Sequence, residues 1–307
     1  MPNPFEQLPF DAVPEAPRVA HDYFATEARE VVVATPHFGR VRTHFRVRGS
    51  GPPLLLVHGF MTTSYSFRYV LEPLARRFTV YAPDLVGSGR TGKPDASYEP
   101  DAIADWLAAL SDELGIRGAA AIGNSLGGYL TMRAALRHPD LYARLVCLHA
   151  PGIPTWRMWA LRLGLWGLPG SFALVRSLVR RDPERWVHSN VHYFDETLKS
   201  REEHREYARP LRTDEGLRAF YRQLDETLDV RAMSRFAAEL ERRGRFPIPL
   251  LLVYARRDPM VPPSVGAALR RLLPDAGFVE LEEASHFAHV DAPEAFLDAT
   301  AGFLESG

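Results

Sequence analysis

One serine of this chain lies in a setting that could make its hydroxyl reactive. Ser125 stands in Gly123-Asn124-Ser125-Leu126-Gly127, directly after an apolar run and directly before a segment with helical spacing. Glycine costs conformational entropy wherever nothing requires it, so these two glycines indicate a sharp turn in which a Cβ would collide with its neighbours. A G-x-S-x-G pattern between a strand and a helix exposes the serine hydroxyl above the sheet. The sequence therefore predicts that Ser125 is a catalytic nucleophile.

A serine hydroxyl needs a base to accept its proton and a carboxylate to orient that base, and both are found downstream. His286 lies in "ASHFAHVDAPE", just after the last predicted strand, and Asp258 lies in "ARRDPMVPP", just after the preceding one. The order Ser, Asp, His is the one that accompanies this kind of turn. We predict that Ser125, Asp258 and His286 form a catalytic triad.

Other polar residues near these motifs have simpler explanations. His289 follows His286 by three positions, but no carboxylate or thiolate joins them at ligand spacing, so we expect no metal and no cofactor. Asp84 and Asp291 are expected to anchor turns through hydrogen bonds to the backbone. His149 ends a predicted strand, where it could face the pocket or support a loop.

Composition and charge restrict the class of protein. The 307 residues are 46% hydrophobic and 24% charged, which is ordinary for a globular chain, and the formal net charge of −1 provides no basic field for nucleic acid. Cys147 is the only cysteine, so no intramolecular disulfide can form and a cytoplasmic location is the default expectation. Arginines and prolines interrupt the most apolar long stretch, about 145–175, which excludes it as a membrane span.

The order of the predicted elements indicates an α/β fold. A β-hairpin near residues 30–49 is followed by short apolar runs that alternate with helical segments, as in a parallel sheet covered by helices. Residues 151–246 hold four of the five tryptophans and no convincing strand, so we interpret them as an all-helical cap. The cap would interrupt a core made of residues 29–150 and 247–307. Residues 1–28, which include five prolines, are expected to form an extended arm rather than a signal peptide.

These motifs together resemble the α/β-hydrolase superfamily, in particular its serine-nucleophile members with a helical cap. The resemblance begins near residue 30 and rests on "HGF" at 58–60, "DLVGSGRT" at 84–91, "GNSLGG" at 123–128, D-x-x-V-P at 258–262 and H-x4-D-x-P at 286–293. It implies a mostly parallel, eight-stranded sheet with an inserted helical cap. It also implies that the backbone N–H groups of Phe60 and Leu126 form the oxyanion hole.

The cap is expected to shape the substrate pocket. Trp156, Trp159 and Leu163 fall on about one face of a predicted helix. This face could pack against the domain below, or it could serve as a membrane-surface or dimer contact. In the functional interpretation, Trp156 and Trp159 line an apolar pocket together with Phe287, and this pocket selects an uncharged, hydrophobic group.

Within the superfamily, the residues favour hydrolysis of small, largely apolar carboxylic esters through an acyl-enzyme. A serine replaces the aspartate nucleophile of dehalogenases and epoxide hydrolases, and "HGFM" at 58–61 matches neither the "HGxP" of epoxide hydrolases nor the "HGGPG" of proline iminopeptidases. Asn124 resembles the elbow of the carbon–carbon bond hydrolases of aromatic degradation, which remain an alternative, although those enzymes usually have tryptophan where this chain has Phe287. A small-molecule receptor built on the hydrolase fold is the second alternative. The sequence does not indicate an oligomeric state.

Overall fold

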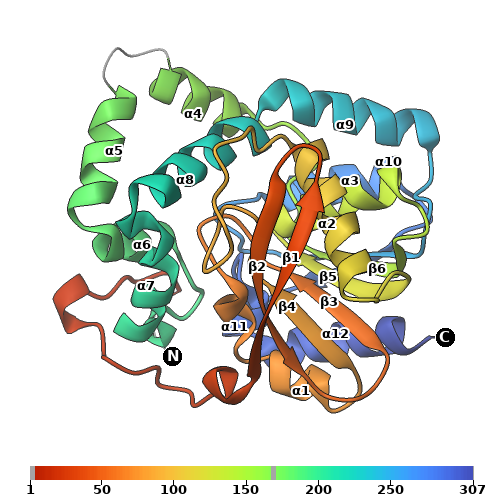
Figure 1. The fold of residues 1–307 in the computed structure, drawn as a ribbon, viewed down its shortest axis with the longest axis horizontal. Coiled ribbons are helices and arrows are strands. Elements are labelled where there is room, and N and C mark those ends of the chain that lie inside the picture. The colour runs from red at the N-terminus through yellow and green to blue at the C-terminus, as the bar shows by residue number, and fades with distance from the viewer. Residues whose placement is uncertain (1–3, 167–170, 307) are drawn as a thin grey trace.

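The centre of the molecule is one eight-stranded sheet (Figure 1). The computed structural model describes residues 4–166 and 171–306, and its strand order is β1-β2-β4-β3-β5-β6-β7-β8. The strands are β1 (Glu27–Thr35), β2 (Gly39–Arg48), β3 (Pro53–Val57), β4 (Thr79–Pro83), β5 (Ala119–Asn124), β6 (Tyr142–Leu148), β7 (Leu250–Ala255) and β8 (Gly277–Leu281). The pairs β1/β2 and β2/β4 are antiparallel, and all the others are parallel. The predicted fold class is therefore confirmed.

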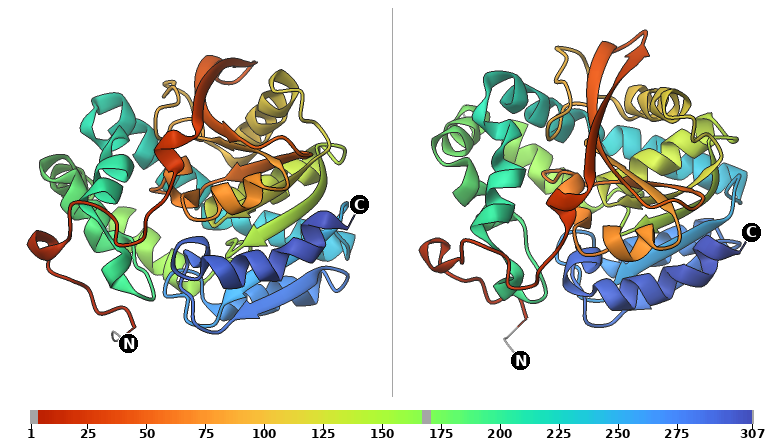
Figure 2. Two further views of the ribbon diagram at one scale, coloured as in Figure 1. Left: turned by 90° about the horizontal axis from the view of Figure 1, so that it is seen from below. Right: turned by 60° about the horizontal axis from the view of Figure 1, so that its bottom comes forward.

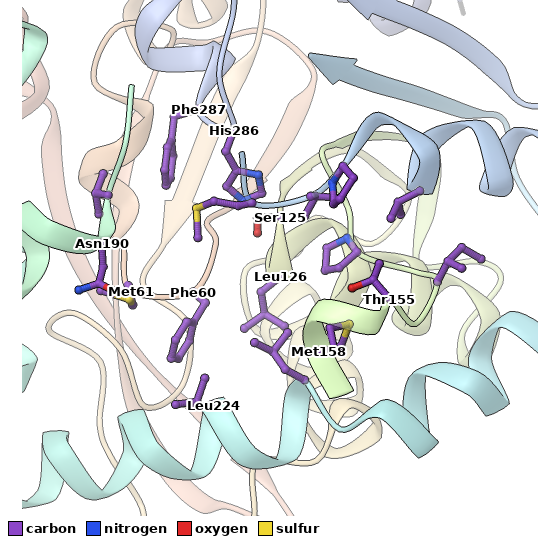
Figure 3. Close-up of a pocket in the computed structure, with 18 of the residues that line it drawn as sticks. Phe60, Met61, Ser125, Leu126, Thr155, Met158, Asn190, Leu224, His286 and Phe287 are labelled. Atoms are coloured by element: carbon purple, nitrogen blue, oxygen red, sulfur yellow. The ribbon is translucent and has the colours of Figure 1, made fainter. Parts of the chain in front are cut away.

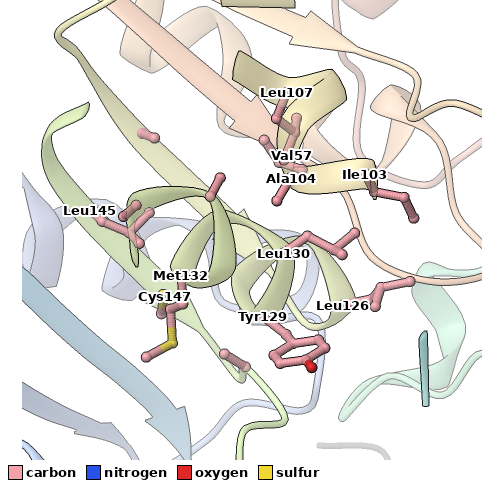
Figure 4. Close-up of a cluster of buried hydrophobic side chains, with 14 of the residues drawn as sticks. Val57, Ile103, Ala104, Leu107, Leu126, Tyr129, Leu130, Met132, Leu145 and Cys147 are labelled. Carbon is pink, nitrogen blue, oxygen red and sulfur yellow. The ribbon is translucent and has the colours of Figure 1, made fainter. Parts of the chain in front are cut away.

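Helices cover both faces of the sheet, which explains why its central strands are apolar on both sides. One face carries α2 (Pro100–Glu113), α3 (Leu126–Arg137) and α10 (Pro263–Leu272), whose apolar side chains form a first buried cluster with the sheet. Figure 4 shows part of this cluster, in which Cys147 packs as a core residue. The other face carries α1 (Leu71–Ala75), α11 (Ala288–Asp291) and α12 (Pro293–Glu305), which belong to a second cluster together with residues of the sheet and of the segment between β6 and β7.

Between β6 and β7, the described residues form only helices and turns. The helices are α4 (Trp156–Trp166), α5 (Ser171–Arg181), α6 (Pro183–Asn190), α7 (Arg201–Ala208), α8 (Asp214–Thr227) and α9 (Val230–Arg243). Three of them begin after the N-cap residues Ser200, Thr213 and Asp229. Each of these side chains accepts the backbone N–H of the residue three positions later. Gly244 ends α9 with a φ of 66°, a left-handed conformation that glycine adopts without strain. These helices lie beside the sheet (Figure 1). Some of their side chains line the pocket described below.

The amino-terminal arm runs along the inserted helices before it enters β1 (Figure 2). Phe10 packs its ring under the Arg201 guanidinium, whose Cζ lies 3.8 Å from the ring centroid. Backbone bonds join the two segments as well, because Arg201 donates its N–H to Pro14 O at 2.8 Å. The arm therefore connects the insertion to the first strand.

A buried ion pair also joins the insertion to the core. Arg68 Nη2 lies 2.5 Å from Glu203 Oε2 on α7, and both side chains are fully buried. Tyr193 donates its hydroxyl to the same carboxylate oxygen at 2.7 Å. Removal of one partner from such a pair leaves an uncompensated buried charge, which strongly destabilises a protein.

No helix within residues 4–166 and 171–306 has both the length and the apolar character that crossing a lipid bilayer requires.

Candidate active site

Ser125 lies at the tight turn between β5 and α3. Its backbone is left-handed, with φ 53° and ψ −121°, a strained conformation for a residue with a side chain. A Cβ on Gly123 would lie 2.6 Å from Gly127 O, and a Cβ on Gly127 would lie 2.2 Å from Val57 O. The collisions expected from the sequence are confirmed, and this elbow tolerates only glycine on each side of the serine.

Asp258 and His286 meet beside this elbow from the ends of two neighbouring strands, β7 and β8. His286 Nδ1 lies 2.7 Å from Asp258 Oδ2, and both residues are buried. The other carboxylate oxygen, Oδ1, accepts the backbone N–H groups of Met260 at 2.7 Å and Val261 at 2.9 Å. Burial by itself raises the pKa of the Asp258 carboxyl, but His286 and the Val261 N–H outweigh it and hold the pKa below its usual value. The group is therefore an ionised carboxylate that accepts the Nδ1–H of His286.

Ser125 and His286 line the same cavity, and Figure 3 shows them next to each other with the serine oxygen directed into the open space. With Nδ1 donating to Asp258, the free Nε2 of the ring is an acceptor. The structure thus brings the three predicted triad residues to one place. Their arrangement is suited to transferring a proton from a serine hydroxyl to an imidazole.

The two predicted oxyanion residues lie near Ser125, the predicted nucleophile. Leu126 is the first residue of α3, so its N–H has no acceptor within the helix. The loop that carries Phe60 contacts Ser125 closely, since a Cβ on Gly59 would lie 3.0 Å from Ser125 Cβ. His58 supports this loop, because it donates Nδ1–H to Gly59 O at 2.8 Å and accepts the Leu85 N–H on Nε2 at 2.9 Å.

His149 is a third buried group at the site, and its role could not be decided from the sequence. It follows β6 with a left-handed φ of 53°, and its Nδ1 lies 3.3 Å from Asp258 Oδ2, the oxygen that also contacts His286. The same Nδ1 accepts the Ala255 N–H at 3.2 Å. Burial lowers the pKa of His149 to about 3, so the ring is neutral. His149 therefore contacts the Asp258 carboxylate as a neutral, fully buried ring that directly follows β6.

Within the described part of the chain, one group of three side chains has the spacing of metal ligands. His149, Asp258 and His286 offer ligand atoms within 4.8 Å of one another. The Nδ1 atoms of both histidines already take part in hydrogen bonds, one with Asp258 and one with the Ala255 N–H. This group is a hydrogen-bond network rather than an open coordination site. His289 lies outside it and packs its ring 5.0 Å from that of Phe67.

The two other motif aspartates bind the backbone, as expected. Asp84 Oδ1 accepts the Ser64 N–H at 2.9 Å, and Asp291 Oδ2 accepts the Phe194 N–H at 2.8 Å. Burial raises the pKa of Asp291 to about 6. Asn124 has a role that was not inferred from the sequence: its Nδ2 donates to His286 O at 3.2 Å and thereby holds the loop that carries His286. A motif match gives no information on this bond, since its two residues are 162 positions apart.

The cavity in front of Ser125 has a volume of about 270 Å³ and is largely apolar. Of the nineteen described residues that line it, only five are not apolar, namely Ser125, Thr155, Asn190, Asp225 and His286. Phe287 is among the apolar ones, and Phe60 contributes its ring, which stacks on that of Phe220 with centroids 4.9 Å apart.

The expected positions of Trp156 and Trp159 in this pocket are wrong. Their side chains are 75% and 53% exposed, and neither lines the cavity, whereas Met158 of the same helix does. Apolar residues occur on more than one side of α4, so the periodicity identified an apolar face but not the direction in which that face points. The expectation that Trp156, Trp159 and Leu163 pack on the domain below is wrong for the same reason, because Leu163 is 72% exposed.

Comparison with known proteins agrees with this architecture. The chain matches the family described as "alpha/beta hydrolase fold" over residues 52–293, and it therefore belongs to that family. It is 26% identical over 288 residues to 2-hydroxymuconate semialdehyde hydrolase of Pseudomonas sp. (strain CF600), a match that covers 90% of this chain and 93% of that protein. It is also 41% identical over 128 residues to an uncharacterised protein of Mycobacterium tuberculosis (strain ATCC 25618 / H37Rv), of which the match spans only 38%.

A solved structure extends the comparison to the fold alone. The epoxide hydrolase CorEH superposes with a TM-score of 0.75 at 23% identity, over 90% of this chain and 100% of that one. The family and this likeness establish a hydrolase fold. They do not distinguish the bond that is cleaved.

Proposed function

We propose that this protein hydrolyses carboxylic esters whose acyl and alcohol groups are uncharged and largely apolar. The observation that carries the proposal is the cavity in front of Ser125 and His286. None of its described lining residues is lysine or arginine, and Asp225 is the only carboxylate among them. An apolar cavity without a cationic partner penalises a charged substrate, because the charge loses its hydration and gains no counter-ion.

In the proposed reaction, the residues act in a fixed sequence. The Ser125 oxygen attacks the ester carbonyl while Nε2 of His286 accepts its proton, and the Asp258 carboxylate holds the imidazole by its Nδ1–H. The oxyanion receives the N–H groups of Phe60 and Leu126, and loss of one such donor typically lowers kcat by about 10²–10³. His286 then protonates the leaving alcohol, and water releases the acyl group from Ser125 by the same steps in reverse.

The carbon–carbon bond hydrolases are the alternative that the comparisons raise. The name of the Pseudomonas relative denotes a carboxylate substrate, a 2-hydroxymuconate semialdehyde. A cavity suited to such a substrate would be expected to offer a cation to the carboxylate. The described lining residues here offer none, which favours the neutral ester.

The test begins with the nucleophile. A fluorophosphonate probe should modify the wild-type protein and should not modify Ser125→Ala. The substrate class is then tested with two p-nitrophenyl esters of equal chain length, the neutral butyrate and the anionic hemisuccinate. We expect kcat/KM to be at least about tenfold higher for the butyrate, which corresponds to about 1.4 kcal/mol.

Four results would contradict the proposal. Labelling that survives Ser125→Ala would show that Ser125 is not the nucleophile. Equal or faster hydrolysis of the hemisuccinate would show that the cavity does not select uncharged substrates. Turnover of a ring-cleavage dienoate that exceeds that of every ester would assign the carbon–carbon reaction instead. Slow hydrolysis of all substrates, with tight binding of the product, would support the receptor alternative.

A further inference from the structure

Helices α4 and α5 expose a group of large apolar side chains to solvent. On α4 these are Trp156, Trp159 and Leu163, which share one helix face and are 75%, 53% and 72% exposed. On α5 they are Leu174 and Leu178, one turn apart and 61% and 50% exposed. We call these five residues the α4/α5 surface. They are five of the nine large apolar side chains that the described residues expose, so such exposure is concentrated on this helix pair.

The segment that carries the α4/α5 surface is also cationic. Residues 151–181 contain five arginines and no lysine, aspartate or glutamate, although the whole chain has a net charge of −1. Arg181 is exposed and follows Leu178 by three positions, so its side chain lies about one turn beyond Leu178 on the same side of α5. Arg180 is paired with Asp214 at 3.0 Å, but both side chains are mostly exposed and the attraction is weak.

We propose that the α4/α5 surface binds an anionic lipid surface. Tryptophan and leucine on the apolar face of a helix, with arginine beside them, is the composition of helices that lie in a membrane interface. Tryptophan is favoured at the level of the lipid headgroups, and arginine is attracted to anionic lipids. A second copy of this chain fits less well, because symmetric association would bring two cationic segments together.

Helix α4 contributes both to the α4/α5 surface and to the lining of the cavity. Met158 lies between the two tryptophans in the sequence and lines the cavity (Figure 3). Because the two tryptophans are exposed, α4 is apolar toward the cavity as well as toward solvent. Met260 also lines the cavity and is 46% exposed, so the cavity reaches the protein surface at this residue. An apolar ester dissolved in the membrane could then reach Ser125 with little exposure to water. This last step rests on the proposed ester hydrolysis, whereas lipid binding does not.

The experiment measures binding of the full chain to lipid vesicles. Sedimentation is compared for vesicles of equal parts phosphatidylglycerol and phosphatidylcholine and for vesicles of phosphatidylcholine alone. We expect binding to the anionic vesicles, weakened by salt, with a blue shift of tryptophan emission that Trp156→Phe/Trp159→Phe removes. Trp159→Ser/Leu163→Ser should weaken binding at least tenfold, and Arg181→Gln should weaken it about fivefold.

Matched variants elsewhere on the surface provide the controls. Val32→Ser removes an exposed apolar side chain on β1, and Arg76→Gln removes an exposed arginine after α1, and neither should change binding. Equal binding by the Trp159→Ser/Leu163→Ser variant, or none by the wild type, would overturn the proposal. So would light scattering that shows a dimer which this variant converts to a monomer. Lipid binding without ester hydrolysis would refute only the proposed function, and hydrolysis without lipid binding would refute only this inference.

Discussion

Replacement of Asp258 by asparagine should abolish catalysis by reversing the tautomer of His286. The backbone N–H groups of Met260 and Val261 donate to Oδ1 at 2.7 and 2.9 Å and therefore require an oxygen at that position. In Asp258→Asn the amide oxygen takes this place, and the amide NH2 takes the place of Oδ2. There it faces His286 Nδ1, now 2.7 Å from a carboxylate oxygen, and must donate to it. The imidazole proton then moves to Nε2, which can no longer accept the proton of Ser125.

The expected loss follows from this reversal. A triad with the wrong tautomer loses about 10⁴ in kcat, which is about 5.5 kcal/mol of transition-state stabilisation. The free energy of unfolding should fall much less, by about 1–1.5 kcal/mol, since one charged hydrogen bond is replaced by a neutral one of similar shape. His149 Nδ1 lies 3.3 Å from the same position and accepts hydrogen bonds, so it also favours an NH2 there.

The assay combines kinetics with a direct view of the tautomer. Turnover of p-nitrophenyl butyrate is compared with the melting temperature, and ¹⁵N shifts of the histidine ring report which nitrogen carries the proton. Asp258→Ala is the control, because it removes the carboxylate without supplying an NH2, and added formate should partly restore its activity. If Asp258→Asn stays within about tenfold of the wild type, or if His286 still carries its proton on Nδ1, the reasoning is wrong.

Two further predictions concern stability and one concerns the network at the base. Gly127→Ala should destabilise the fold by more than about 3 kcal/mol, since its Cβ would lie 2.2 Å from Val57 O. Gly302→Ala on α12, where a Cβ would meet no atom within 4 Å, should stabilise the fold by about 0.5–1 kcal/mol, and urea unfolding measures both changes. The pKa of Asp291 is raised to about 6 in the folded state, so its contribution to stability is present below about pH 4 and is lost as the pH rises through 6. The difference in unfolding free energy between the wild type and Asp291→Asn should therefore fall by about 3 kcal/mol over this range, and a constant difference would contradict the prediction. His149→Phe removes the acceptor of the Ala255 N–H and should lower kcat more than it raises KM for p-nitrophenyl butyrate; an effect on KM alone would argue against a role in positioning Asp258.

The fold was predictable because each of its signals is local. Apolar runs such as Leu54–Val57 and Leu250–Ala255 are buried on both faces, and this pattern indicates a parallel sheet without any knowledge of the neighbours. The elbow was predictable for a similar reason. A Cβ is excluded at positions 123 and 127 by crowding, and the sequence shows this directly because it has glycine at both positions around one serine.

The contacts made across the sheet edge could not be read in the same way. His149 reaches Asp258 only because β6 and β7 are neighbours, and its left-handed φ of 53° turns the ring toward the carboxylate. For α4, the sequence specified which residues share a face, but the direction of that face depends on how the whole insertion sits on the core. The exposed Trp156 and the cavity-lining Met158 are two positions apart, so their side chains point about 200° apart around the helix.

Asn124 shows which residues carry information on the reaction and which do not. An asparagine before the nucleophile was the feature that most resembled the carbon–carbon bond hydrolases. In this structure its amide donates to His286 O at 3.2 Å, a contact that positions the base whatever bond is cleaved. Ester and carbon–carbon hydrolysis would both benefit from it, so the resemblance at this position does not favour either. The residues that can discriminate are those that line the cavity beyond Ser125 and His286, and here these include Met158, Asp225 and Phe287. Met158 and Phe287 provide apolar area, Asp225 provides a carboxylate, and none of the three provides a cation. The choice between the two reactions therefore depends on the cavity rather than on the elbow.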